Sequence, residues 1–200
     1  MMKIPSENNG ARREAILEAA FQCFANYGFK RVSMDDIAVA AGLSRPALYN
    51  HFRNKTEIFR ACFVALAGQV AEDAGKAALA AGNLVDGLDA LVNIAFIRPH
   101  REIGQMPHGA ELLGMKTDFA ADLMEEWYRS VEKHACAVIG RWGGAGASQL
   151  GAETAGRLFV HAVEGIKGRL LSIEEAEADM KAMVRLFAAA LRPEKHSSQT

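Results

Sequence analysis

Apolar residues recur every three or four positions along most of this chain, which is the spacing that places them on one face of an α-helix. The first such run covers residues 12–27, where Ile16, Ala20 and Phe24 share a face and Gly28 follows. Glycine often ends a helix because it adopts left-handed backbone conformations at little steric cost. No run alternates apolar and polar residues as a half-buried strand would. The pattern predicts an all-α fold.

Two shorter helices follow, separated by a glycine turn. Ser33 precedes the first of them, where its hydroxyl can accept hydrogen bonds from free backbone N–H groups of the helix start. Gly42 then permits a tight turn, and Ser44 caps a second short helix that ends near His51. We therefore expect a helix, a turn and a helix between residues 33 and 51.

Longer helices account for most of the remaining chain. Ser172 and Glu175 have the spacing of a capping box, which marks the start of one of them. Pro99 disfavours helical backbone at the residue before it, so another helix is expected to stop near Arg98. The expected long helices cover residues 54–81, 84–98, 118–140, 152–171 and 172–191, with at most short helical pieces in 99–117.

Composition narrows the class of protein. Half of the 200 residues are apolar and 24% are charged, as in globular domains. The three cysteines are odd in number and far apart, which excludes a disulfide framework and a CxxC zinc site. No apolar run approaches the ~20 residues of a membrane span, and residues 1–10 are polar where a secretion signal is apolar. We expect a cytoplasmic protein that does not bind membranes.

The two short helices lie in the more basic part of the chain. Residues 1–60 carry nine Lys and Arg against six Asp and Glu, and residues 61–200 carry fourteen against eighteen. The second helix of a DNA-binding helix-turn-helix must project into the major groove. On that helix Arg45, Tyr49 and Asn50 lie opposite the apolar face and can donate to bases or phosphates. A solvated polar face is the alternative interpretation.

The residues around this turn resemble a known family. Asp36-Ile-Ala, Ala-Gly-Leu-Ser44 and Leu-Tyr49-x-His-Phe-x-x-Lys55 are similar to the N-terminal DNA-binding domain of the TetR family of bacterial transcriptional regulators. The resemblance covers about residues 12–60. It implies a three-helix helix-turn-helix DNA-binding domain at residues 1–55 and a helical effector-binding and dimerisation domain at residues 56–200. It further implies a homodimer, in most cases a repressor, that binds a palindromic double-stranded DNA operator and is released by a small molecule.

The resemblance also assigns roles to eight residues of the DNA-binding domain. Pro46 departs from the small residue often found at its position, but it suits a first helical turn, and its ring can contact a thymine methyl group. By this resemblance Ser33 and Ser44 contact phosphate, Arg45, Pro46 and Asn50 face bases, and Tyr49, His51 and Lys55 contact the DNA backbone.

The resemblance places the dimer seam at the last two helices. Both have wide apolar faces, and residues 172–191 carry an unbroken apolar stripe, whereas packing within one chain is the alternative explanation. The stripe expected at the seam is Met180, Met183, Val184, Phe187 and Leu191.

Aromatic, Met and His residues of the C-terminal part are candidates for an effector pocket, because apolar ligand sites combine such side chains with few polar groups. Each of them taken singly is also an ordinary core residue, and His134 on an apolar stripe is most simply a satisfied core histidine. The set lacks a formal counter-charge, so the effector is expected to be apolar. The candidates are Phe63, Phe96, Met106, His108, Met115, Met124, Trp127, Tyr128, His134 and Phe159.

The sequence does not favour catalysis, a metal site or a cofactor. His134 and Cys136 are too close and isolated for a zinc site, and no nucleophile motif or glycine-rich phosphate loop occurs. Two alternatives to an effector-controlled regulator stay open. One is a regulator controlled by a protein partner or by oxidation of Cys62 or Cys136, and the other is a ligand-binding or enzymatic helical bundle whose DNA-binding domain is vestigial.

Overall fold

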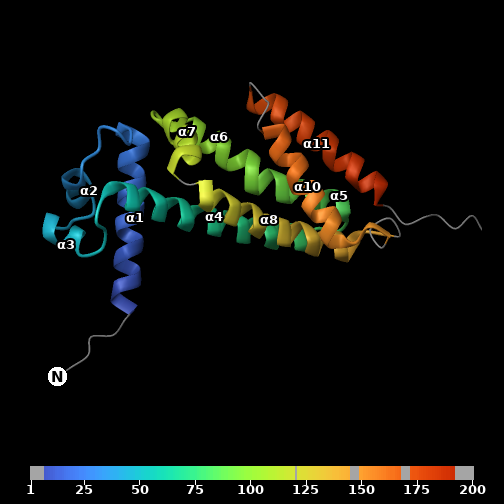
Figure 1. The fold of residues 1–200 in the computed structure, drawn as a ribbon, viewed down its shortest axis with the longest axis horizontal. Helices are drawn as coiled ribbons and strands as arrows, with labels where there is room; N and C mark the ends of the chain where they lie inside the picture. Colours follow the sequence, from blue (N-terminus) through green and yellow to red (C-terminus); the bar gives the residue numbers. More distant parts are fainter. Residues whose placement is uncertain (1–6, 120, 145–148, 168–171, 192–200) are drawn as a thin grey trace, which may run out of the picture. The chain divides into compact units, whose positions relative to one another are not determined.

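The computed structural model describes residues 7–119, 121–144, 149–167 and 172–191, and within these ranges the chain contains helices and no strand. The predicted all-α class is therefore confirmed (Figure 1). The helices are α1 (Glu7–Tyr27), α2 (Met34–Ala40), α3 (Arg45–Tyr49), α4 (Lys55–Ala80), α5 (Leu84–Val92), the π-helix η1 (Asn93–Ile97), α6 (Arg98–Gly104), α7 (Gly109–Phe119), α8 (Ala121–Trp142), α10 (Ala152–Lys167) and α11 (Ile173–Ala190).

Packing divides the chain into two compact units. The first comprises Met1–Ala67 with Glu102–Met124, and the second comprises Gly68–Arg101 with Glu125–Thr200. Helices α4, α6 and α8 each contribute residues to both units. These units do not test the predicted boundary between a DNA-binding domain at residues 1–55 and an effector-binding domain at residues 56–200, which stays a prediction.

The core of the first unit is built on three phenylalanine rings. Phe24 of α1 lies 5.3 Å from Phe29 and 6.0 Å from Phe59 of α4, between ring centroids. Gly28 joins α1 to the next segment with φ +83°, and a Cβ there would lie 2.6 Å from Glu111 Oε2. Glycine suits this position because its backbone adopts φ +83° at little steric cost, and the side chains of Glu111 and His108 lie close to it.

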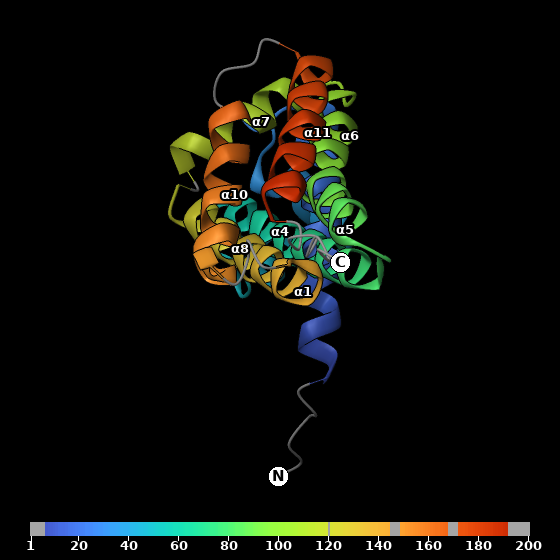
Figure 2. The ribbon, with the colours of Figure 1, turned by 90° about the vertical axis from the view of Figure 1, so that its right-hand side faces the viewer.

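The core of the second unit is contributed by α5, α8, α10 and α11. Leu88 of α5, Val131 of α8, Phe159 of α10 and Val184 of α11 are each completely buried. Figure 2 shows α10 and α11 side by side, and the rings of Phe159 and Phe187 meet edge to face at 5.3 Å between centroids. The apolar stripes read from the sequence thus face a common interior.

Several helix boundaries differ from those expected. The stop near Arg98 is wrong, because the chain stays helical from Leu84 to Gly104 through the π-helical turn of η1. In that turn the Arg98 N–H donates to the Asn93 carbonyl, five residues back. This wider turn accommodates Pro99, which lacks an N–H and crowds the preceding turn of a regular α-helix.

Other differences are shifts of a few residues. Helix α1 begins at Glu7 rather than near residue 12, and α8 begins at Ala121 because residues 118 and 119 belong to α7. The end expected for α10, residues 168–171, lies outside the described residues. The segment 99–117, expected to hold at most short helical pieces, is mostly helical, because α6 and the 11-residue α7 cover all of it except residues 105–108. In the described part of the chain, no helix combines the length and hydrophobicity needed to cross a membrane.

Candidate nucleic-acid interface

A capping box fixes the start of α2. The Ser33 hydroxyl accepts a hydrogen bond from the Asp36 N–H at 3.2 Å, and Asp36 Oδ2 accepts from the Ser33 N–H at 2.8 Å. The Ser33 hydroxyl also donates to Asp36, and these bonds lower the pKa of that carboxyl group below its usual value. Two free donors of the helix end are thereby satisfied within the helix.

The turn between α2 and α3 has the geometry expected from its sequence. Gly42 adopts φ +65°, and the Leu43 N–H donates to the Ala38 carbonyl at 2.8 Å. The Ser44 hydroxyl then caps α3 by accepting from the Ala47 N–H at 3.4 Å. Pro46 lies in the first turn of α3, where its missing N–H has no partner within the helix to lose. Figure 1 shows α2 and α3 as two short helices joined by this turn.

Helix α3 packs on the core through the side chain of Leu48, and most of its other side chains are exposed to solvent. Leu48 is completely buried in the core of the first unit. Tyr49 on the opposite side of the helix is 41% exposed. Six of the eight residues predicted to contact DNA are exposed, namely Ser33, Ser44, Arg45, Pro46, Tyr49 and Asn50, while His51 and Lys55 are half-buried.

Arg45 has a partner that the sequence did not point to. Its Nη1 lies 2.7 Å from Asp35 Oδ2 of α2, and its guanidinium lies 5.5 Å from the centre of the Tyr49 ring. Both members of the ion pair are more than half exposed, and such pairs contribute little to stability. The Arg45 guanidinium is therefore exposed and held only by a weak surface ion pair.

Lys55 is engaged inside the unit. Its Nζ donates to the carbonyls of Phe29 at 2.8 Å, Val32 at 2.9 Å and Lys30 at 3.2 Å. An ammonium group has three N–H donors, so all of them are used by the segment between α1 and α2. The same group lies 4.7 Å from the centre of the Phe29 ring. This geometry does not support the expected phosphate contact and assigns Lys55 a structural role.

The ten candidates for an effector pocket are divided between the two units. In the first unit Met115 is buried in the core, and His108 Nδ1 lies 3.5 Å from Glu111 Oε2. Neither residue needs a ligand to account for its environment. The first unit contains Phe63, Met106, His108, Met115 and Met124, and the second contains Phe96, Trp127, Tyr128, His134 and Phe159.

In the second unit the structure brings three of the candidates together. The Trp127 ring lies 4.9 Å from Phe96 and 5.1 Å from Tyr128, between centroids. Lys167 lies against this aromatic cluster, and the sequence analysis missed it because nothing in the helical pattern distinguishes one lysine at a helix end from another. The cluster of Phe96, Trp127, Tyr128 and Lys167 is the Lys167 cage.

The other two candidates of this unit have simpler environments. Phe159 is completely buried and packs against Phe187. His134 is half-buried, with Nε2 3.8 Å from Glu72 Oε1. Their surroundings match those of ordinary core residues.

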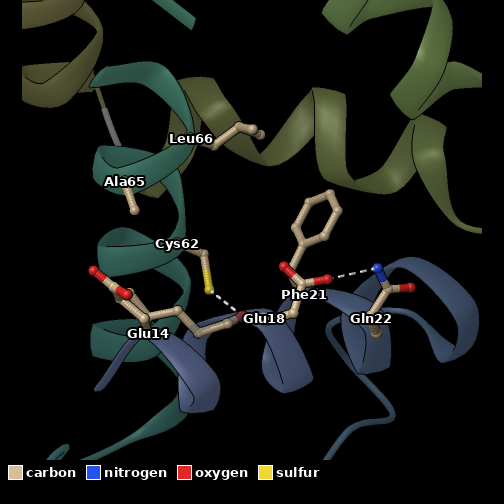
Figure 3. Close-up of a pocket in the computed structure, with 8 residues that line it drawn as sticks. Glu14, Glu18, Phe21, Gln22, Cys62, Ala65 and Leu66 are labelled. Atoms are coloured by element: carbon tan, nitrogen blue, oxygen red, sulfur yellow. Dashed lines mark hydrogen bonds between the residues drawn. The ribbon is translucent and has the colours of Figure 1, made fainter. Parts of the chain in front are cut away.

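A groove of about 270 Å³ lies between α1 and α4 within the first unit (Figure 3). The Cys62 thiol points from α4 toward α1 and donates to the Leu17 carbonyl at 3.3 Å. Burial, followed by the charge of Glu18, raises the pKa of Cys62 to about 12. The groove is lined by Glu14, Leu17, Glu18, Phe21, Gln22, Cys62, Ala65 and Leu66, and none of these is a predicted effector contact.

The apolar stripe expected at the dimer seam is used by the chain's own core. Met180, Met183, Val184 and Leu191 are buried within the second unit, and Phe187 is partly buried against it. The prediction that this stripe faces a second subunit is therefore not supported. Large apolar side chains are instead exposed on other faces of these helices, where Leu158 of α10 is 45% exposed and Leu186 of α11 is 70% exposed.

Comparisons with known proteins relate the region of the helix-turn-helix to a family of regulators. Residues 16–62 match the model of bacterial regulatory proteins of the tetR family. The HTH-type transcriptional repressor Rv1474c of Mycobacterium tuberculosis is 39% identical over 59 residues, which are 30% of this chain and 32% of that protein. The match thus spans about a third of that relative's length.

Two solved structures share the fold over nearly the whole chain. A TetR transcription regulator from Haloarcula marismortui superposes with a TM-score of 0.68 at 18% identity, covering 91% of this chain and 98% of that one. SmeT, the repressor of the Stenotrophomonas maltophilia multidrug efflux pump SmeDEF, has a TM-score of 0.60 at 20% identity over 91% of both chains. SmeT has also been solved in complex with triclosan.

Proposed function

We propose, for a chain whose N-terminal region belongs to the TetR family of bacterial regulatory proteins, that it is a one-component transcriptional repressor acting in the cytoplasm. It binds a palindromic operator as a homodimer and leaves it when a small molecule binds the second unit. The observation that carries the proposal is α3 and its C-cap Asn50, where Arg45, Tyr49 and Asn50 are exposed while Leu48 is buried in the core.

The arrangement of α2 and α3 supports DNA recognition rather than a merely solvated face. A recognition helix needs donors that reach base edges, and Arg45 and Asn50 provide the donor geometry for guanine and adenine. Tyr49 beside Arg45 adds a phenolic donor for phosphate. Relatives of the first unit are transcriptional regulators rather than enzymes, which supports a regulatory role over a catalytic one.

Selection of bound duplexes from a random library tests DNA recognition directly. We expect the wild-type protein to enrich an inverted repeat, because a two-fold dimer reads two equal half-sites about one helical turn or more apart. Arg45→Ala should abolish the enrichment, whereas Arg129→Ala, which removes an exposed arginine of the second unit, should not. Failure of the wild type to enrich any sequence would refute the proposal.

The outer faces of α10 and α11 support the homodimer. Leu158 and Leu186 expose apolar surface that the core of their own unit does not cover. A two-fold seam there would bury each of them against its symmetry mate. Leu186→Glu should then give monomers in sedimentation, while Val64→Glu, at an exposed apolar site of the first unit, should stay dimeric. If the Leu186→Glu variant stays dimeric, Leu186 does not lie in the dimer interface.

The Lys167 cage supports effector binding in the second unit, with a largely apolar effector. Release requires only that the effector bind the DNA-incompetent state more tightly than the competent one, and couplings of about 1 to 3 kcal/mol are typical. Control by thiol oxidation is disfavoured at Cys62, where burial raises the pKa to about 12 and so suppresses the reactive thiolate.

A further inference from the structure

Lys167 is a cation held in an apolar setting without a carboxylate partner. Its Nζ lies 5.4 Å from the Trp127 ring centre and 5.6 Å from the Tyr128 ring centre, and it donates to the Tyr128 hydroxyl at 3.5 Å. Among the ion pairs of the described residues, none joins a carboxylate to Lys167 within 4 Å, and Glu164 contributes a coulombic interaction without such a pair. Burial lowers the pKa of Lys167 and raises that of Tyr128 to about 12.

A second donor in the same cluster lacks an acceptor. The indole N–H of Trp127 is buried and has no hydrogen-bond partner among the described residues. Buried polar groups in native proteins are nearly always paired, because an unpaired one costs about 1 to 3 kcal/mol. The Lys167 cage thus contains a cation without a counter-charge and an indole N–H without an acceptor.

A small cavity opens directly beside Lys167. It holds about 90 Å³, which is room for about three water molecules or a carboxylate with its first methylene groups. Apart from Lys167 and the polar side chains of His100 and Ser172, its walls are apolar. Among the residues that the structure describes, the lining is Phe96, Ile97, His100, Lys167, Ser172, Ile173, Ala176 and Met180.

The charge of the cavity selects among ligand classes. A cationic ligand would be repelled by Lys167, which already occupies the faces of the two rings as a cation does. An uncharged alcohol leaves Lys167 without a counter-charge. A carboxylate satisfies the ammonium with a charge-assisted bond, which is about twice as strong as a neutral one.

We propose that the Lys167 cage binds the carboxylate of an amphipathic monocarboxylic acid whose hydrocarbon part lies against Phe96, Ile97 and Met180. This inference rests on the proposed function, in which the second unit binds the effector, and it names the effector's chemical class. It also revises the expectation of an apolar effector, because Lys167, which the helical pattern does not single out, places a positive charge beside the cavity.

Three six-carbon probes of equal chain length test the proposal. Hexanoate, hexan-1-ol and hexan-1-amine are titrated by calorimetry into a protein of all 200 residues, without DNA. We expect saturable binding of hexanoate about tenfold tighter than of hexan-1-ol, since a hydrogen bond to a charged group is worth somewhat more than a factor of ten. Hexan-1-amine should not bind at the cage. In nuclear magnetic resonance spectra, hexanoate should shift the indole N–H signal of Trp127.

Variants assign the effect to the cage. Lys167→Met should remove the tenfold preference for hexanoate, and Lys167→Arg should retain it. The control Lys133→Met removes an exposed lysine of α8 and should bind as the wild type does.

The proposal would be overturned if hexanoate and hexan-1-ol bound with equal affinity, or if Lys167→Met kept the full preference for hexanoate. It would also be overturned if hexanoate showed no saturable binding up to about 10 mM, a dissociation constant that corresponds to a binding free energy of about 3 kcal/mol. The duplex selection described above uses no ligand. A protein that selects an operator but ignores hexanoate therefore refutes only this inference. One that binds hexanoate but selects no operator refutes the proposed function.

Discussion

Lys55 was expected to contact DNA, but its hydrogen bonds indicate a structural role. The substitution Lys55→Met tests which of these two roles it has. Methionine keeps an unbranched side chain of similar length but removes the ammonium group, which lies 4.7 Å from the centre of the Phe29 ring. The carbonyls of Phe29, Lys30 and Val32 then lose a shared donor. The segment between α1 and α2, which positions the helix-turn-helix, loses its tie to the start of α4.

The size of the effect follows from the bonds that are lost. A hydrogen bond involving a charged group contributes about 1.5 to 3 kcal/mol net. Three bonds to one half-buried ammonium do not add in full, because they share one charge and water can reach part of the site. We expect Lys55→Met to lower the free energy of unfolding by about 2 to 3 kcal/mol, a large part of the ~5 to 15 kcal/mol of a typical domain.

Two measurements are needed, with Lys30→Met as the matched control. Lys30 is exposed and contributes its backbone, not its side chain, to the contacts described above. Urea titration should show the loss of stability for Lys55→Met and little change for Lys30→Met. Affinity for a generic DNA duplex should fall with salt at the same slope in Lys55→Met and in the wild type, compared at temperatures where both are folded.

The opposite pattern would refute the structural role. Each phosphate contact adds about 0.9 to the slope of log affinity against log salt concentration. A slope reduced by about one in Lys55→Met, with stability unchanged, would show that the ammonium contacts DNA and that the three carbonyls do not depend on it.

Two further predictions concern stability. Gly28→Ala should lower the free energy of unfolding by about 1 to 3 kcal/mol, because φ +83° is strained for alanine and its Cβ would meet Glu111 and His108. Gly10→Ala, in an open part of α1, should raise the free energy of unfolding by about 0.5 to 1 kcal/mol. Denaturant titrations that give both variants the same free energy of unfolding would contradict this account. Lys167 has a lowered pKa in the folded state, so the unfolded chain binds more protons and the stability of the ligand-free wild type relative to Lys167→Met should rise as pH increases toward the ordinary lysine value of 10.5. Unfolding free energies measured at several pH values check this, and a difference that stays constant or falls would show that Lys167 is not desolvated.

Much of the secondary structure of the first unit can be predicted from residues that act on nearby backbone groups. Ser33, Gly42 and Ser44 act on backbone groups within three to five residues of themselves, so their capping and turn geometry does not depend on distant parts of the chain. The seating of α3 by Leu48 likewise follows from helical periodicity. These local effects explain why the helix-turn-helix and its outward residues were predictable.

The tertiary structure decided what depends on partners far away in sequence. Lys55 meets carbonyls more than twenty residues earlier, and Lys167 meets rings from α8, so neither role leaves a mark on the surrounding pattern. The apolar face of α11 looks the same in sequence whether it packs on its own chain or on a second one, and packing assigned Met180 and Val184 to the core. Periodicity states which face of a helix is apolar, whereas only the three-dimensional arrangement states what that face touches, because contact energies depend on neighbours that chain order does not specify.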